Sequence, residues 1–306
     1  MVQENSLRKI IIICGPTASG KTDLAVQVAK LLDSEVISAD SMYIYKGLNI
    51  GTAKPTLEEM NGVKHHLIDV VEPNETFTVS DYKTLAQPII DDLHSRGKIP
   101  VICGGTGFYI NSLLFDLSYG NSCSNLQARE KYKKLAQEFG NEYVYQRLKE
   151  VDPESAEKLH FNDIKRVIRA LEIYESGNLK SSIKDDYKPK YEYFAYHIDH
   201  DRENLYNRIN SRVEKMVENG LLEEIKDLLS QGITAENQCM QAIGYKEILE
   251  YLSGNITLEQ AINLIKLNTR HYAKRQITFF KRLNGLVGLK PDDTLILANT
   301  IIKGLI

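Results

Sequence analysis

The first third of the chain alternates short apolar runs with longer stretches of helical periodicity. Runs rich in isoleucine and valine are typical of buried strands, and apolar residues spaced three or four positions apart indicate helices. Strands are expected at residues 10–14, 35–38, 66–70 and 99–103, and helices at 23–32 and 79–94. This alternation predicts a parallel sheet made of βαβ units.

After about residue 121 the pattern becomes helical. Charged residues are interleaved with spaced apolar positions, and Asp152-Pro153 is typical of a helix start. Helices are expected at 128–139, 142–150, 153–159, 163–176, 202–218, 221–230, 241–253 and 258–282, and one more strand at 191–198. The simplest arrangement is an α/β core with C-terminal helices (1–120 and 190–306), interrupted by an all-helical insertion (121–189). The polar stretch 181–190 is the expected mobile linker.

A glycine-rich loop directly follows the first apolar run. Residues 15–22 read GPTASGKT, the G-x-x-x-x-G-K-[ST] spacing of a phosphate-binding loop (P-loop). Glycines let backbone N–H groups converge on phosphate oxygens, the lysine adds a positive charge, and the last hydroxyl can hold Mg²⁺. Because a strand and a helix flank the loop, we favour phosphate binding over an ordinary turn. The expected phosphate ligands are Gly15, Pro16, Thr17, Ala18, Ser19, Gly20, Lys21 and Thr22, with Thr22 as the metal ligand.

Two other strand ends carry candidate chemistry at the same edge of the sheet. Asp40 follows the second strand, where its carboxylate can bind a metal or act as a base, and an equally good alternative is that it caps the next turn. The fourth strand ends in Gly104-Gly105-Thr106-Gly107, in which glycines permit close approach and Thr106 offers a hydroxyl. A plain strand-to-helix turn is the alternative there.

Other acidic and histidine residues suggest metal binding less strongly. Asp69 ends the only apolar run that stops in an acid in the manner of nucleotide hydrolases, and the chain has no N-K-x-D signature for guanine recognition. The pair His65-His66 and the run 197–200 (HIDH) lack a complete ligand set at a known spacing. We therefore expect structural histidines, with Asp69 as a candidate metal-side acid.

The charge distribution indicates a polyanion partner met by a local patch. The net charge is only −3, yet residues 261–290 contain no acidic residue and seven basic ones. These are Lys266, Arg270, Lys274, Arg275, Lys281, Arg282 and Lys290. The insertion adds Lys165, Arg166 and Arg169 at helical spacing. Phosphate backbones are the usual partners of such basic stripes, although a solvated basic helix is the alternative.

The cysteine spacing and the length of the apolar runs indicate the cellular compartment. Cys14, Cys103, Cys123 and Cys239 lie far apart and form no C-x-x-C pair, which argues against a disulfide scaffold or a zinc finger and fits a reducing cytoplasm. The longest early apolar run, residues 10–14, is too short for a signal peptide or a membrane span. We expect a cytoplasmic protein with no membrane partner.

Several motifs in a fixed order resemble those of the tRNA dimethylallyltransferases, which prenylate the adenine next to the anticodon of certain tRNAs. The motifs are GPTASGKT (15–22), ISADSMYIYKGLNIGTAKP (37–55), HHLIDVVEP (65–73), VICGGTGFYI (101–110), NDIKRVIRALEIYESG (162–177), QAIGYKE (241–247) and KRQITFFKR (274–282). Tyr43 stands where the family often has Gln, and Phe279 where Trp is frequent. The absence of the eukaryotic zinc finger indicates a bacterial-type member.

The resemblance implies a P-loop parallel-sheet core with an inserted helical domain that contacts tRNA. It implies that residues 15–22 hold the diphosphate of dimethylallyl diphosphate, that Mg²⁺ is the cofactor, and that Asp40, Thr106 and Lys21 act at the reacting centre, Asp40 as the base. It places tRNA contacts at Asp40, Ser41, Met42, Tyr43, Thr106, Arg129, Lys165, Arg166, Val167, Ile168, Arg169, Gln241, Ala242, Ile243, Gly244, Tyr245, Lys246, Lys274, Arg275, Gln276 and Arg282.

The expected partners are therefore a tRNA anticodon stem-loop and dimethylallyl diphosphate, bound by a monomer. Three alternatives remain open at this point. One is a transferase that prenylates free adenine nucleotides, the second is a small-molecule kinase with the same sheet, and the third is a tRNA-binding module whose loop has lost its function.

Overall fold

A computed structural model describes residues 7–118 and 125–305. Contacts divide the chain into two compact units, Met1–Leu114 with Pro189–Ile306, and Phe115–Lys188. The second unit thus begins six residues before the expected boundary at 121 and ends one residue before 189. We describe each unit separately.

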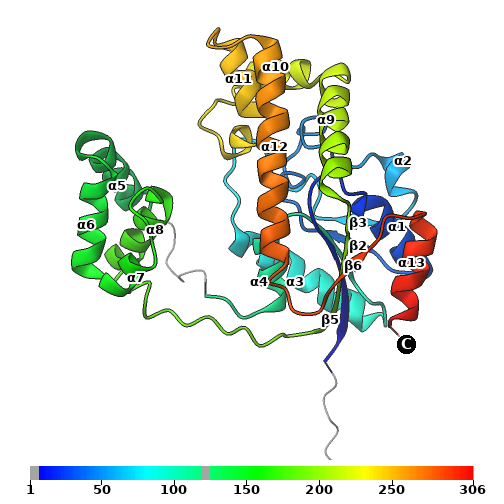
Figure 1. The fold of residues 1–306 in the computed structure, drawn as a ribbon. Helices are drawn as coiled ribbons and strands as arrows, with labels where there is room; N and C mark the ends of the chain where they lie inside the picture. Colours follow the sequence, from blue (N-terminus) through cyan, green and yellow to red (C-terminus); the bar gives the residue numbers. More distant parts are fainter. Residues whose placement is uncertain (1–6, 119–124, 306) are drawn as a thin grey trace, which may run out of the picture. The chain divides into compact units, whose positions relative to one another are not determined.

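The first unit is built on a six-stranded parallel sheet (Figure 1). At its centre is β1 (Lys9–Cys14), whose isoleucines are completely buried. The strand order is β3-β2-β4-β1-β5-β6, with β2 (Val36–Ser38), β3 (His65–His66), β4 (Val101–Gly104), β5 (Glu192–Ile198) and β6 (Leu286–Leu289). Every neighbouring pair is parallel, so the loops after β1, β2 and β4 emerge at one edge.

Helices supply the apolar surface that buries this sheet. The helices of the first unit are α1 (Lys21–Leu31), α2 (Leu57–Met60), α3 (Val79–Ser95), α4 (Gly107–Leu114), α9 (Arg202–Glu218), α10 (Leu221–Ser230), α11 (Tyr245–Leu252), α12 (Leu258–Phe280) and α13 (Thr294–Lys303), with a 3₁₀ turn at Gln238–Gln241. Helices α1 and α13 lie side by side (Figure 1), and Leu24 and Leu297 share one core with Ile11 and Ile13 of β1.

The second unit is a small helical bundle of α5 (Leu126–Phe139), α6 (Asn141–Val151), α7 (Pro153–Glu157) and α8 (Ile164–Glu175). Its core is formed by Tyr132, Val144, Leu148, Val167 and Leu171, which come from α5, α6 and α8. The expected linker is tied to this bundle, because Ser181 N donates to Asp152 Oδ2 (3.0 Å) and residue 186 bridges residue 116.

Several elements differ from the sequence expectation. The strand expected at 66–70 is only two residues long, because Leu67 (φ 61°) and Asp69 (φ 55°) adopt left-handed conformations that a strand excludes. Strand β6 and helices α2, α4 and α13 were not expected. Most other helices begin and end within three residues of their predicted bounds.

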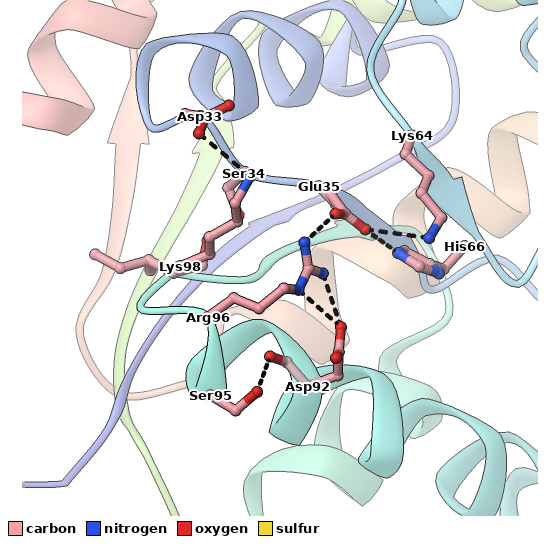
Figure 2. Close-up of polar contacts among 10 residues, drawn as sticks. Asp33, Ser34, Glu35, Lys64, His66, Asp92, Ser95, Arg96 and Lys98 are labelled. Atoms are coloured by element: carbon pink, nitrogen blue, oxygen red, sulfur yellow. Dashed lines mark hydrogen bonds and ion pairs between the residues drawn. The ribbon is translucent and has the colours of Figure 1, made fainter.

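A polar cluster fixes the edge of the sheet where β2 begins, away from the loops described below (Figure 2). The carboxylate of Glu35 accepts a hydrogen bond from Arg96 (2.7 Å) and lies 2.6 Å from His66 Nε2 and 3.6 Å from Lys64 Nζ. The hydrogen bond from Arg96 and the contact with His66 lower the pKa of Glu35 to about 2. The ionised carboxylate therefore joins β2, β3 and the end of α3.

No helix in the described part of the chain is long and apolar enough to span a membrane. Cys14, Cys103 and Cys239 are buried thiols, and Cys123 lies outside the described residues.

Candidate active site

The P-loop joins β1 to α1 in the geometry that the motif requires. Ala18 (φ 62°) and Gly20 (φ 88°) take left-handed conformations that turn the chain into the first turn of α1. The side chain of Lys21 is only 9% exposed, and its Nζ donates to Pro16 O (3.2 Å). Burial lowers the pKa of Lys21, and the nearby carboxylate of Asp40 is among the groups that oppose this shift.

One hydroxyl of the loop is left without a partner. Ser19 Oγ is buried and has no hydrogen bond to any described residue. A buried polar group normally has a partner, so an orphaned hydroxyl in a cradle of backbone N–H groups fits a site for an anion.

Side chains from three distant segments hold the P-loop in place. Gln276 of α12 accepts from Thr17 N (3.0 Å) and donates to Gly105 O (2.9 Å), so one buried amide joins the P-loop to the turn after β4. His200 Nε2 lies 2.9 Å from Ser19 O, and Arg208 of α9 donates to Ala18 O (2.7 Å).

A second arginine of α9 reaches the P-loop one turn further along. Arg212 donates to Thr17 Oγ1 (3.0 Å) and to Ala53 O (3.2 Å). Arg208 and Arg212 are four residues apart and so share one helix face. Neither arginine was predicted as a site residue from the sequence, and His200 was expected to be structural. The R-x-x-x-R spacing on a predicted helix was visible, but nothing in it shows that the helix faces the loop.

The ends of β2 and β4 meet beside the P-loop. Thr106 Oγ1 accepts from Ser41 N (3.0 Å) and donates to Ser41 Oγ (3.3 Å), and Thr106 N donates to Ala39 O (3.0 Å). Gly104 allows this approach, because a Cβ there would lie 2.1 Å from Ala39 O. Asp40 Oδ1 accepts from Met42 N (3.0 Å), so the carboxylate does cap the following turn while its other oxygen remains available.

Two tyrosines border this group. Tyr43 donates to Ala53 O (2.9 Å), the carbonyl that also accepts from Arg212. Burial raises the pKa of Tyr272 of α12 to about 12, while hydrogen bonding to Thr106 and Gln276 opposes the shift. Burial also raises the pKa of Tyr43, so both phenols are neutral at physiological pH. The P-loop, Asp40, Ser41, Tyr43, Thr106 and Gln276 thus lie together at one edge of the sheet.

A buried carboxylate that the sequence analysis missed fixes the loop of residues 49–53. Glu224 of α10 is 8% exposed and accepts from Asn49 N (2.8 Å), Ile50 N (2.6 Å) and Gly51 N (3.0 Å), and from the hydroxyl of Tyr245 (2.6 Å). The same loop presents the Ala53 carbonyl to Arg212. Glu224 therefore acts through the loop on the arginine that touches the P-loop.

Other candidate metal residues have structural partners. Lys54 Nζ donates to Asp69 Oδ1 (2.5 Å), and β3, which precedes Asp69, is an edge strand separated from β1 by two others. Asp69 thus has a structural partner, and its role as a metal-side acid stays a prediction. His65 Nδ1 lies 2.9 Å from Val63 O. Among residues 7–118 and 125–305, no group of three or more His, Cys, Asp or Glu side chains could hold a metal ion.

The basic residues of the second unit are arranged differently from the expectation. Glu172 is completely buried and accepts from Arg129 (3.0 and 3.1 Å), with Arg169 NH1 2.9 Å away. Val167 and Ile168 are buried in the bundle core, so their side chains support α8 and do not reach a ligand. Lys165 and Arg166 are exposed, and Arg166 pairs with Asp163 (3.4 Å).

The basic segment of α12 divides into paired and solvent-facing residues. Lys266 donates to Glu214 (2.6 Å) and Arg270 to Asn210 (2.8 Å), whereas Lys274, Arg275 and Arg282 are exposed. Of the other expected tRNA contacts, Gln241 and Lys246 are exposed, Ala242 and Ile243 are half-buried, and Gly244, Tyr245 and Gln276 are buried. The buried ones therefore position the loops.

The comparisons with known proteins agree with this geometry. The family model described as IPP transferase matches residues 43–283. The chain is 49% identical over 278 residues to a tRNA dimethylallyltransferase of Alkaliphilus metalliredigens, covering 90% of this chain and 89% of the relative. Among solved structures it resembles the full-length tRNA isopentenylpyrophosphate transferase of Bacillus halodurans (TM-score 0.73, 41% identity, 97% of both chains).

A eukaryotic dimethylallyltransferase, crystallised acting on tRNA, has a TM-score of 0.78 at 32% identity, with 97% of this chain and 77% of that one covered. The family match extends over well more than half of the chain, and the similarity to the bacterial structure extends over nearly all of it. The P-loop, the Asp40-Ser41 turn and the Gly104–Gly107 turn come together as the sequence motifs imply. This chain belongs to the IPP transferase family.

Proposed function

We propose that this protein is a prenyltransferase that moves the dimethylallyl group of dimethylallyl diphosphate to the N6 amine of the adenine 3′ of the anticodon in tRNA. The observation that carries the proposal is the meeting of a phosphate loop with Asp40, Ser41 and Thr106, joined by Gln276 and Arg212. A phosphate-binding loop and a proton acceptor therefore lie at the same edge of the sheet.

The diphosphate end of the donor fits the P-loop. Backbone N–H groups, Lys21 and the unpartnered Ser19 hydroxyl offer donors to phosphate oxygens, and Arg212 lies against Thr17 of the same loop. As the allylic C–O bond breaks, its electron pair stays on the diphosphate. Fixed positive charge at that end stabilises the leaving group as positive charge develops on the allylic carbon.

Mg²⁺ is the proposed cofactor, with Thr22 as its protein ligand. Thr22 is the second residue of α1, and a hydroxyl with phosphate oxygens and water makes the hard oxygen set that Mg²⁺ prefers. When bound, the ion would add positive charge at the leaving diphosphate.

Asp40 is the proposed base for the acceptor. The adenine has to leave its stack to bring N6 to the allylic carbon. As the N6–C bond forms, the N6 proton passes to the Asp40 oxygen that does not cap the turn. Thr106 and Ser41 hold the backbone next to Asp40, and Thr106 lies at the reacting centre.

The tRNA is proposed to contact exposed cations of both units. In the first unit these are Lys246, Lys274, Arg275 and Arg282, and in the second Lys165 and Arg166. Arg129 and Arg169 both contact the buried carboxylate of Glu172, and the partly exposed guanidinium of Arg129 is a further proposed phosphate contact. We propose a cytoplasmic monomer.

Acceptor competition tests the proposal against its rivals. Labelled dimethylallyl diphosphate is supplied with an anticodon stem-loop RNA, with AMP, or with ATP and no RNA. We expect label on the stem-loop alone. Label on AMP would identify a free-nucleotide transferase. Transfer of the γ-phosphoryl group of ATP to a small-molecule acceptor, with release of ADP, would identify a kinase. Stem-loop binding without pyrophosphate release would leave only a tRNA-binding module.

A further inference from the structure

An exposed aromatic side chain lies at the turn that carries Thr106. Phe108, in the first turn of α4, is 60% exposed, a large fraction for a phenylalanine. Its ring packs edge-on against Phe279 of α12, with centroids 5.4 Å apart and planes at 61°. Phe279 lies so close over Gly107 that a Cβ at that position would meet the ring at 2.2 Å.

This pair is rigidly tied to the candidate reacting centre. Phe108 is two residues after Thr106, whose hydroxyl binds Ser41. Gln276, three residues before Phe279, donates to Gly105 O (2.9 Å) and accepts from Thr17 N. The aromatic pair therefore sits at a fixed position beside the P-loop and Asp40.

Positive charge flanks the pair. Arg275 is four residues before Phe279 and so lies on the same face of α12, and Arg282 is three residues after Phe279, just past the end of the helix. Both arginines are exposed. An exposed ring on a cationic surface is an arrangement that binds unpaired bases of single-stranded RNA.

We propose that Phe108 stacks on an RNA base next to the adenine to be modified. The inference rests on the proposed function. When the adenine leaves its stack, each of the two neighbouring bases loses a stacking partner. The Phe108 ring, held beside the candidate site, replaces that partner for one of the two bases. The charges favour RNA over an apolar peptide as the occupant, because the surface around the pair is cationic.

The test measures binding of an anticodon stem-loop and of two stem-loops with one abasic nucleotide on either side of the target adenine. Phe108→Ala should raise the Kd of the intact RNA about tenfold, and should leave unchanged the Kd of the RNA that lacks the stacked base. Phe108→Tyr should bind like the wild type. Phe108→Leu keeps an apolar contact with Phe279 without a ring, and should behave like Phe108→Ala.

Leu57→Ala is the matched control, because Leu57 is 85% exposed and lies on α2, outside the two elements that carry the aromatic pair. It should leave every Kd unchanged. Equal Kd values for wild type and Phe108→Ala, or equal weakening on all three RNAs, would overturn the stacking role. Wild-type protein that prenylates none of the stem-loops would overturn the proposed function, whereas transfer without this discrimination would overturn only the inference.

Discussion

At the residue scale, different side chains serve the two ends of the proposed reaction. Lys21, Arg212 and the loop N–H groups serve the diphosphate, and Asp40 serves the adenine. One carboxylate oxygen of Asp40 accepts a hydrogen bond from Met42 N, and the other is available. Asp40 can therefore both cap the turn and act as a base, the two roles that the sequence left open. Tertiary structure was needed here, because Gln276 and Arg212 come from helices more than 190 residues beyond the loop they hold.

Asp40→Asn tests the base directly. The amide keeps the cap acceptor for Met42 N but cannot take the N6 proton, so kcat should fall about 100-fold or more. Binding of the stem-loop should stay within about twofold of wild type, since the change removes no cation. Single-turnover transfer and an RNA titration measure the two quantities. An unchanged rate would remove Asp40 from the proton-transfer step.

Arg212→Lys tests the assignment of the second arginine to the donor. A lysine keeps the positive charge but lacks the planar guanidinium, which donates hydrogen bonds to Thr17 and Ala53 at the same time. The KM for dimethylallyl diphosphate should rise about tenfold, and the Kd for RNA should not change. Lys266→Arg, on a cation that pairs with Glu214, is the control. A change confined to RNA binding would contradict the assignment.

At the element scale, periodicity predicted most helices and four of the six strands to within a few residues, but it extended β3 too far and missed β6 and three helices. The helices of both units follow apolar spacing that the sequence shows, and Asp152-Pro153 starts α7 as expected. Strand β6 (LVGL) is short, contains a glycine and lies at the edge of the sheet, so neither length nor composition marked it. The left-handed Leu67 and Asp69 depend on tertiary contacts, among them the hydrogen bond from Asp69 N to Tyr43 O (3.0 Å).

Glu224→Gln tests how one loop positions another. The amide has one acceptor oxygen where the carboxylate has two, so some of the three backbone N–H groups lose their partner, at about 1–3 kcal/mol each. The thermal midpoint should fall, and the KM for dimethylallyl diphosphate should rise through Arg212. Glu223→Gln, on the exposed neighbour, should do neither. A lower thermal midpoint with an unchanged KM would make Glu224 purely structural.

At the scale of the whole molecule, the Glu35 cluster of Figure 2 predicts how the fold responds to acid. The folded-state pKa of about 2 lies below the ordinary value of 4.5, so this stabilisation is complete above about pH 4.5 and is lost as the pH falls towards 2. Between pH 6 and 3, the free energy of unfolding should fall by about 1–2 kcal/mol more in the wild type than in Glu35→Gln. If the free energy of unfolding of wild type and of Glu35→Gln fell equally over this pH range, the proposed role of Glu35 in acid sensitivity would be contradicted.

The products of one turnover show whether both substrates meet in the core unit. An anticodon stem-loop is incubated with dimethylallyl diphosphate, digested to nucleosides and analysed by mass spectrometry, while pyrophosphate is measured in the same sample. The account predicts one dimethylallyl group on N6 of the adenine 3′ of the anticodon for each pyrophosphate released. Pyrophosphate released without modified adenine, or a prenyl group on any other atom, would contradict it.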